Sequence, residues 1–112
     1  MNSELVDHAI LLSRDPWFAE QFPCIPAELQ FADTQSLFRF LDTNEKRMII
    51  VLDGKIEGFP NWSGNNLVIM FHDFSSGGGT DLYDTGEVTM AFNRDVDESF
   101  VIVNNIIEQM IV

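Results

Sequence analysis

The sequence predicts an α/β fold built on a doubly wound, five-stranded parallel sheet. Its 112 residues, 46% of them hydrophobic, suit one domain over 1–112 with a single modest core. The apolar runs are short and unbroken, which is typical of strands buried on both faces of a parallel sheet. They alternate with helix-like segments, as right-handed crossovers between parallel strands require.

The first unit of the chain pairs a strand with a short helix. The apolar run His8–Leu12 predicts a strand, and Asp15 followed by Pro16 predicts a helix start with Asp15 as the N-cap. This helix covers 17–22 and ends at the prolines that follow it. Residues 28–31 alternate weakly between polar and apolar, so we expect a strand nearer the edge of the sheet.

The second unit has the same order. The polar segment 33–36 opens a helix whose apolar residues have helical spacing. These residues are Leu37, Phe38, Phe40 and Leu41. After a polar turn over 42–47, the run 48–52 predicts the clearest strand of the chain, which ends at Asp53.

The second half of the chain supplies two more strands and a final helix. The runs 67–71 and 88–92 predict strands, and 97–112 predicts a helix capped by Asp97. The segments between the last three strands are short or rich in glycine, so a crossover helix of about 11 residues with its loops does not fit them. We therefore expect the third and fourth helices to be shortened or missing.

The charge of the chain excludes several classes of partner. Eighteen Asp and Glu residues against six Lys and Arg give a formal net charge of −12 at pH 7. A nucleic-acid binder needs clustered basic residues for its phosphate contacts, and an anionic membrane surface would also repel this chain. The acidity instead favours solubility and basic partners.

Several signals favour a cytoplasmic domain with no membrane insertion. The single cysteine, Cys24, excludes an intrachain disulfide and has no activating neighbour in the sequence. The first seven residues carry two acids and no base, unlike a secretory signal, and no apolar run reaches the roughly 18 residues of a membrane span. The apolar residues 110–112 indicate either the N-terminal part of a longer protein or a final helix that packs.

Polar residues stand where the predicted strands end. In parallel sheets, ligand sites lie at the carboxyl ends of the strands. The residues expected there are Ser13, Arg14, Asp15, Asp53, His72, Asp73, Asn93 and Arg94. His72 with Asp73 could perform acid–base chemistry, but a structural histidine at a strand end is the simpler interpretation because no nucleophile or second base is identifiable beside it.

The order of these segments resembles the receiver domain of bacterial response regulators over nearly the whole chain. The matching segments are 10–16, 48–53, 67–72 and 90–95. None of them is a rare motif alone, so their order and their placement at strand ends carry the resemblance. It implies a receiver-like (flavodoxin/CheY-like) sheet.

The resemblance assigns the phosphoacceptor position to Asp53. Receivers bind a divalent metal through two acids that end the first strand, and the metal offsets charge on the transferring phosphoryl group. Here those two positions hold Ser13 and Arg14, and Asp15 follows one step late. A serine and an arginine cannot replace two hard carboxylate ligands.

The remaining receiver positions are also altered. His72 stands in place of the hydroxyl residue that ends the fourth strand, and Arg94, or Asn93 if the register slips by one, stands in place of the lysine that ends the fifth. Since one of the five expected groups survives in kind, these departures from the receiver pattern predict no bound metal, no cofactor and no catalytic residue.

Arg14 allows two interpretations. Its guanidinium could pair with Asp53 and occupy the place of both metal and phosphoryl charge, which would lock the domain in one conformation. Alternatively, Arg14 points to solvent and Asp53 caps the turn at Gly54.

The final helix is our candidate for dimerisation, because its apolar residues extend around more than one face. The interface residues we expect are Phe100, Val103, Ile107 and Met110. The alternative is that both faces pack within the domain or against a downstream part of the protein. Trp17 is most simply a core residue, although an exposed aromatic side chain there would mark an interface.

Together these features predict a non-enzymatic protein-interaction or localisation module, not phosphorylated, that forms a homodimer. The chain resembles the atypical receiver at the N-terminus of TadZ/CpaE-type proteins of Flp/Tad pilus assembly. That resemblance implies an attached ParA/MinD-like ATPase, other pilus-assembly proteins as partners and a place at the cell pole. The alternative is the receiver domain of a two-component transcriptional regulator, phosphorylated on Asp53 or controlled by a ligand.

Overall fold

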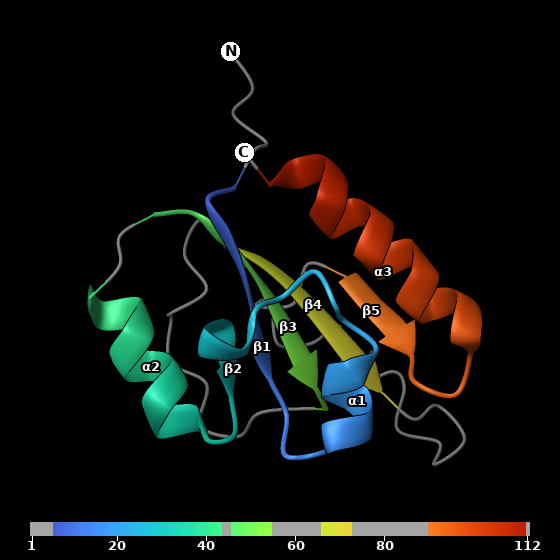
Figure 1. The fold of residues 1–112 in the computed structure, drawn as a ribbon, viewed down its shortest axis with the longest axis horizontal. Helices are drawn as coiled ribbons and strands as arrows, with labels where there is room; N and C mark the ends of the chain where they lie inside the picture. Colours follow the sequence, from blue (N-terminus) through green and yellow to red (C-terminus); the bar gives the residue numbers. More distant parts are fainter. Residues whose placement is uncertain (1–5, 44–45, 55–65, 73–89, 112) are drawn as a thin grey trace.

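The computed structural model describes residues 6–43, 46–54, 66–72 and 90–111 (Figure 1). Its strands are β1 (His8–Leu12), β2 (Gln30–Phe31), β3 (Met48–Asp53), β4 (Leu67–His72) and β5 (Met90–Asn93). Its helices are α1 (Pro16–Glu20), α2 (Thr34–Thr43) and α3 (Asp97–Met110), and a 3₁₀ turn, η1 (Ala27–Leu29), precedes β2.

The strands form one parallel sheet in the order β2-β1-β3-β4-β5. This confirms the predicted α/β fold with five parallel strands, and the order is compatible with a receiver-like domain. β1 and β3 pair over their whole shared length, from His8 opposite Met48 to Leu12 opposite Leu52. Because all strands run in one direction, their carboxyl ends lie along the same edge of the sheet, called the carboxyl edge below.

Helices cover both faces of the sheet (Figure 1). α1 and α3 pack on one face, and α2 packs on the other. In β3, Ile49 and Val51 belong to the α1/α3 face, whereas Ile50 and Leu52 belong to the α2 face, and all four are fully buried. This two-sided burial explains why the strands have unbroken apolar sequences.

An aromatic cluster fills the α1/α3 face. Phe71 of β4 stacks on Phe100 of α3, with ring centroids 4.8 Å apart and planes 12° from parallel. Phe18 and Phe22 meet Phe71 edge-on at 5.2 and 5.6 Å. Such pairs stabilise a core beyond the area that they bury. Packing against this cluster is what holds the five-residue α1 in place, since so short a helix is not stable alone.

The first two helices begin as their sequences predict. Asp15 is the N-cap of α1, and its Oδ1 accepts a hydrogen bond from Trp17 N at 3.0 Å. Asp33 does the same for α2, accepting from Ser36 N at 2.8 Å and from Ser36 Oγ at 3.1 Å. Both hydrogen bonds lower the pKa of Asp33, and the one from the backbone N–H of Ser36 has the larger effect.

The predicted cap of the final helix is wrong by one residue. Val96 is the N-cap, with no side-chain hydrogen bond, and Asp97 is the first helical residue. Asp97 and Glu98 lie in the first turn, where carboxylates interact favourably with the helix dipole. At the other end, Ile111 forms a parallel bridge with Val6, which ties α3 to the start of β1.

Further boundaries differ from the predictions: α1 ends at Glu20 instead of residue 22, and α3 ends at Met110 instead of residue 112. β2 begins at Gln30 instead of residue 28 because residues 27–29 form η1. α2 continues to Thr43, into the segment predicted as a turn. The chain between β3 and β4 and between β4 and β5 lies almost wholly outside the described residues, so the shortened or missing third and fourth helices stay a prediction.

The four residues of α3 predicted as a dimer interface lie in the domain core or pack against it. Val103 and Ile107 are fully buried, Phe100 is 5% exposed, and Met110 packs against the same core. Their spacing of three or four residues places them on the helix face that contacts the sheet. That interface prediction is therefore wrong, because this face is occupied by the domain itself. The exposed apolar side chains of α3 are Val101 and Ile102.

Candidate functional site at the carboxyl edge

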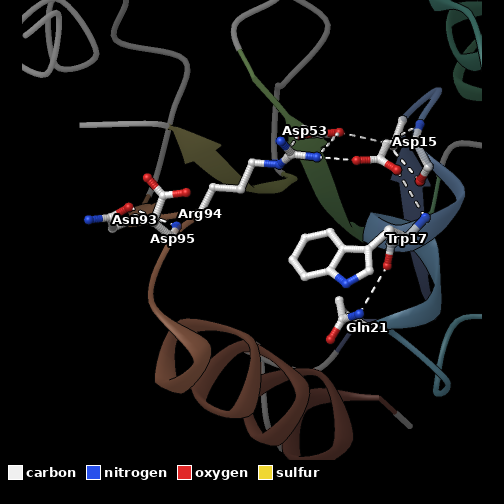
Figure 2. A network of polar contacts seen from close by, with 8 residues as sticks. Asp15, Trp17, Gln21, Asp53, Asn93, Arg94 and Asp95 are labelled. Atoms are coloured by element: carbon white, nitrogen blue, oxygen red, sulfur yellow. Dashed lines mark hydrogen bonds and ion pairs between the residues drawn. The ribbon is translucent and has the colours of Figure 1, made fainter. Parts of the chain in front are cut away.

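Four polar side chains from three strand ends meet at the carboxyl edge, as Figure 2 shows in part. Ser13 and Asp15 follow β1, Asp53 is the last residue of β3, and Arg94 follows β5. Hydrogen bonds and ion pairs join all four. We call this group the Asp53 cluster, and it lies where strand order predicts a site.

Ser13 holds Asp53 from the β1 side. Ser13 Oγ donates to Asp53 Oδ2 at 2.7 Å and accepts a hydrogen bond from Asp15 N at 3.0 Å. The Asp53 side chain is 14% exposed, so these contacts are largely shielded from water. Gly54 N donates to Phe71 O at 2.9 Å, and the φ of Gly54 is +97°, a left-handed value that favours glycine. The chain therefore turns away immediately after Asp53.

Arg94 holds Asp53 from the β5 side (Figure 2). Its Nε lies 3.0 Å from Asp53 Oδ1, and its Nη2 lies 3.5 Å from Asp53 Oδ2. The same Nη2 donates to Asp15 Oδ2. One guanidinium thus serves two carboxylates, a task for which its planar fork of donors is suited. The permanent positive charge of Arg94 offsets one of the two negative charges in the cluster.

Two aromatic rings support the guanidinium. Arg94 Cζ lies 5.7 Å from the centroid of the Trp17 ring and 5.6 Å from that of Phe18. Cation–π attraction at such distances favours this position of the side chain. Trp17 in turn meets Phe100 edge-on, with centroids 5.6 Å apart. The Asp53 cluster is therefore continuous with the aromatic cluster of the α1/α3 face.

Asp15 links two connections of the chain. One of its carboxylate oxygens caps α1 by accepting from Trp17 N, and the other accepts from Arg94 after β5. The β1–α1 connection and the β5–α3 connection are thus tied together across the carboxyl edge.

Arg14 does not belong to the cluster. Its Nε donates to Ala32 O at 3.0 Å beside β2, and its side chain is exposed. Of the two interpretations of Arg14, the one that points its side chain away from the site is confirmed, and the pair of Arg14 with Asp53 is wrong because Arg94 makes that contact instead. The physical reason is that successive side chains of an extended chain point to opposite sides, so Ser13 and Asp15 face the cluster and Arg14 faces away. The same alternation was the signal that could have found the Ser13–Asp53 hydrogen bond.

The other predicted site residues have separate positions. His72 ends β4 opposite Asn93 of β5, but its side chain and Asp73 lie outside the described residues. Asn93 Oδ1 accepts a hydrogen bond from Asp95 N at 2.9 Å in the turn after β5. Of the two residues proposed in place of the receiver lysine, Arg94 is therefore the one that reaches Asp53.

The side chains of the Asp53 cluster do not fit a divalent metal as the receiver resemblance would require. Such a metal needs several hard oxygen ligands, usually carboxylates. Asp15 and Asp53 both already contact the guanidinium of Arg94. Within the described ranges, no group of three or more His, Cys, Asp or Glu side chains is placed to hold a metal ion.

Cys24 lies apart from the cluster, between α1 and α3. Its Sγ lies 3.0 Å from Asn104 Oδ1, to which the thiol donates, and burial raises the pKa of the Cys24 thiol. A raised pKa keeps the sulfur protonated and weakly nucleophilic at neutral pH. The prediction that this cysteine is not activated agrees with that environment.

Comparison of the chain with protein-family models, with curated proteins and with solved structures finds no match. The fold therefore stands on the observed strand order, and membership of the receiver family stays a prediction. Among the residues that the structure describes, no helix has both the length and the apolarity needed to cross a bilayer.

Proposed function

We propose that this domain is a non-enzymatic interaction or localisation module in which a receiver-like acceptor position is held permanently by the protein's own side chains. The observation that supports this proposal is the pairing of Asp53 with Ser13 and Arg94. A receiver switches because phosphoryl transfer changes the charge at this position. Because Asp53 is already paired with the fixed cation of Arg94 and the hydroxyl of Ser13, its charge stays balanced and does not change in this way.

The geometry of the pair also opposes phosphoryl transfer. The attacking carboxylate oxygen must approach phosphorus in line with the leaving oxygen. Asp53 Oδ2 accepts from Ser13 at 2.7 Å, and Oδ1 lies 3.0 Å from Arg94 Nε. A phosphoryl donor would have to displace these contacts, and a metal would have to compete with the guanidinium for Asp15 and Asp53.

The second candidate is a receiver domain of a transcriptional regulator, phosphorylated on Asp53 or controlled by a ligand. Its support is the position of Asp53 at the end of the central strand, where its carboxylate keeps a small exposed area. Under this proposal Arg94 would leave Asp53 when the phosphoryl group arrives.

The resemblance to TadZ/CpaE-type proteins supports a narrower form of the first proposal. In that form the module acts in Flp/Tad pilus assembly at the cell pole, with a ParA/MinD-like ATPase and other assembly proteins as partners. Reading the gene beyond codon 112 tests this directly. A deviant Walker motif there supports the pilus role, whereas an AAA+ module or a helix-turn-helix supports the regulator.

The test of the main proposal is phosphoacceptance. The domain is incubated with acetyl phosphate and Mg²⁺, and its intact mass is measured. We expect no adduct, because Asp53 is occupied by Ser13 and Arg94. The variants D53A and D42A serve as a matched pair, since Asp42 is an exposed acid on α2. An adduct of about 80 Da that is lost in D53A and kept in D42A would support the regulator instead.

A further inference from the structure

Exposed apolar side chains gather on and beside α3. Among the described residues, the large hydrophobic side chains that remain exposed are Trp17, Val96, Val101 and Ile102. Val101 is 60% exposed and Ile102 45%. Val96 is the N-cap of α3, and Trp17 contacts Phe100 of the same helix. Two adjacent exposed apolar residues, such as Val101 and Ile102, mark an interaction site more often than a single scattered residue does.

Val101 and Ile102 lie on the second turn of α3, between its acidic first turn and Glu108, and both belong to its outward face. The exposed residues of the helix are Asp97, Glu98, Val101, Ile102, Asn105, Glu108 and Gln109. At about 100° per residue these positions form one continuous stripe opposite the buried Phe100, Val103 and Ile107. The stripe therefore has an apolar pair with polar and acidic residues on both sides of it, which is the arrangement of a small protein–protein interface.

The charges on this stripe are all negative. Asp97 and Glu98 stand before the apolar pair and Glu108 stands after it, and α3 contains no Lys or Arg. A segment that covers Val101 and Ile102 must therefore place its own flanking residues against carboxylates. Complementary charge there speeds association and selects the partner.

We propose that the outward face of α3 docks a basic segment of a partner protein whose apolar residues cover Val101 and Ile102. An amphipathic helix with Lys or Arg beside its apolar stripe has this chemistry. This inference rests on the proposed interaction function and names the partner class of that module. The buried face of α3 stays in the domain core, so docking requires no unfolding.

A second copy of the chain is a poor occupant of the same face. A symmetric pair places the same patch on both subunits, so the carboxylates of one helix would face those of the other. Each copy carries a net charge of −12, with no basic residue on α3 to offset the repulsion. An anionic membrane is excluded as an occupant for the same reason.

The test uses two synthetic peptides of identical lysine and leucine composition. In one, leucine recurs at helical spacing; in the other, the same residues are scrambled. Each is titrated into the ¹⁵N-labelled domain at about 0.15 M salt, where long-range charge effects are screened. We expect the amphipathic peptide to shift amide signals chiefly over residues 97–109 and to bind at least about tenfold more tightly than the scrambled one.

Matched variants separate the apolar and charged contributions. V101S/I102S should weaken binding about tenfold, and E98Q/E108Q should weaken it and reduce its salt dependence. The control D42N/E28Q removes the same charge from exposed positions outside α3 and should leave binding unchanged. D53A should also bind normally, so a failure here is distinct from a failure of the Asp53 proposal.

Three results would overturn the inference. The first is equal binding of the two peptides, or shifts spread over all acidic surfaces, since either means non-specific charge attraction. The second is no binding by either peptide at millimolar concentration. The third is a sedimentation profile in which the domain dimerises and V101S/I102S makes it monomeric, which would assign the face to a second copy.

Discussion

The two faces of the sheet are built from different side chains and have different connections to the carboxyl edge. The α1/α3 face is aromatic, and its Phe18 lies 5.6 Å from the guanidinium of Arg94. The α2 face is mainly aliphatic around Leu37, Ile50 and Leu52. Both faces bury the apolar side chains of the central strand β3, so packing alone does not explain why one face carries the rings that support Arg94. The comparison indicates that the α1/α3 face performs two tasks, burial and placement of the Asp53 cluster.

The same division is visible in the alternation of the strands. Leu11 and Val51 point to the α1/α3 face, and two residues later Ser13 and Asp53 continue on that side. Arg14 continues the side of Leu12, toward β2 and α2. Period-two geometry therefore assigns the polar cluster to the aromatic face.

The largest expected effect comes from truncating one core side chain on each face. F100A should lower the free energy of unfolding by about 3–5 kcal/mol and L37A by about 2–5 kcal/mol, because both leave a cavity in a packed core. Only F100A should also shift the NMR signal of Arg94 Nε–H, since Phe100 contacts Trp17 and Phe18, which flank the guanidinium. Urea unfolding gives the first quantity and ¹H–¹⁵N spectra the second.

The two variants serve as controls for one another, because both remove a large buried side chain. If L37A moved the Arg94 signal as far as F100A does, the two faces would be coupled equally to the cluster. The distinction between them would then be lost.

A smaller effect is expected at the start of α2. Hydrogen bonds from Ser36 lower the pKa of Asp33 below its ordinary value of 3.8. A carboxyl group whose pKa is lower in the folded state contributes stability above its unfolded pKa, and this contribution is lost as the pH falls through the folded pKa. Wild type should therefore lose more stability than D33N between pH 5 and pH 2, by about the amount that one exposed helix cap contributes.

Urea midpoints across that pH range measure the Asp33 effect. Because Asp33 belongs to the α2 side, D33N should leave the Arg94 signal unchanged at pH 7. Parallel acid titrations of wild type and D33N would contradict the assignment of this cap.

The parallel strands and their approximate boundaries could be predicted because burial on both faces leaves unbroken apolar runs such as His8–Leu12. The start of α1 could be predicted because an N-cap aspartate followed by proline has a local cause. Contacts between residues that are far apart in the sequence were harder to predict. The shared direction of the strands places Asp53 and Arg94 on the same edge of the sheet. The receiver resemblance assigned Arg94 to the position of the conserved lysine, but the sequence did not show that its side chain reaches across β4 to Asp53.

One open alternative and one wrong prediction have specific physical reasons. The sequence left open whether Arg14 pairs with Asp53 or points to solvent, and alternation decides it, because Ser13 and Asp15 face Asp53 and their neighbour Arg14 points to the opposite side. Phe100, Val103 and Ile107 were proposed as an interface because α3 has more apolar residues than one stripe needs. Helical spacing alone does not say which of two apolar stripes faces the sheet, and the exposed one contains Val101 and Ile102.

The central claim is that Arg94 and Asp53 form a fixed pair at the carboxyl edge. A double-mutant cycle with R94M, D53N and their combination measures it most directly, from free energies of unfolding in urea. We expect a coupling energy of about 1–3 kcal/mol, because the Asp53 side chain is largely buried and the guanidinium is its charged partner. The parallel cycle of R94M with D42N, an exposed acid on α2, should give a coupling near zero. A coupling near zero for Arg94 with Asp53 as well would contradict the claim.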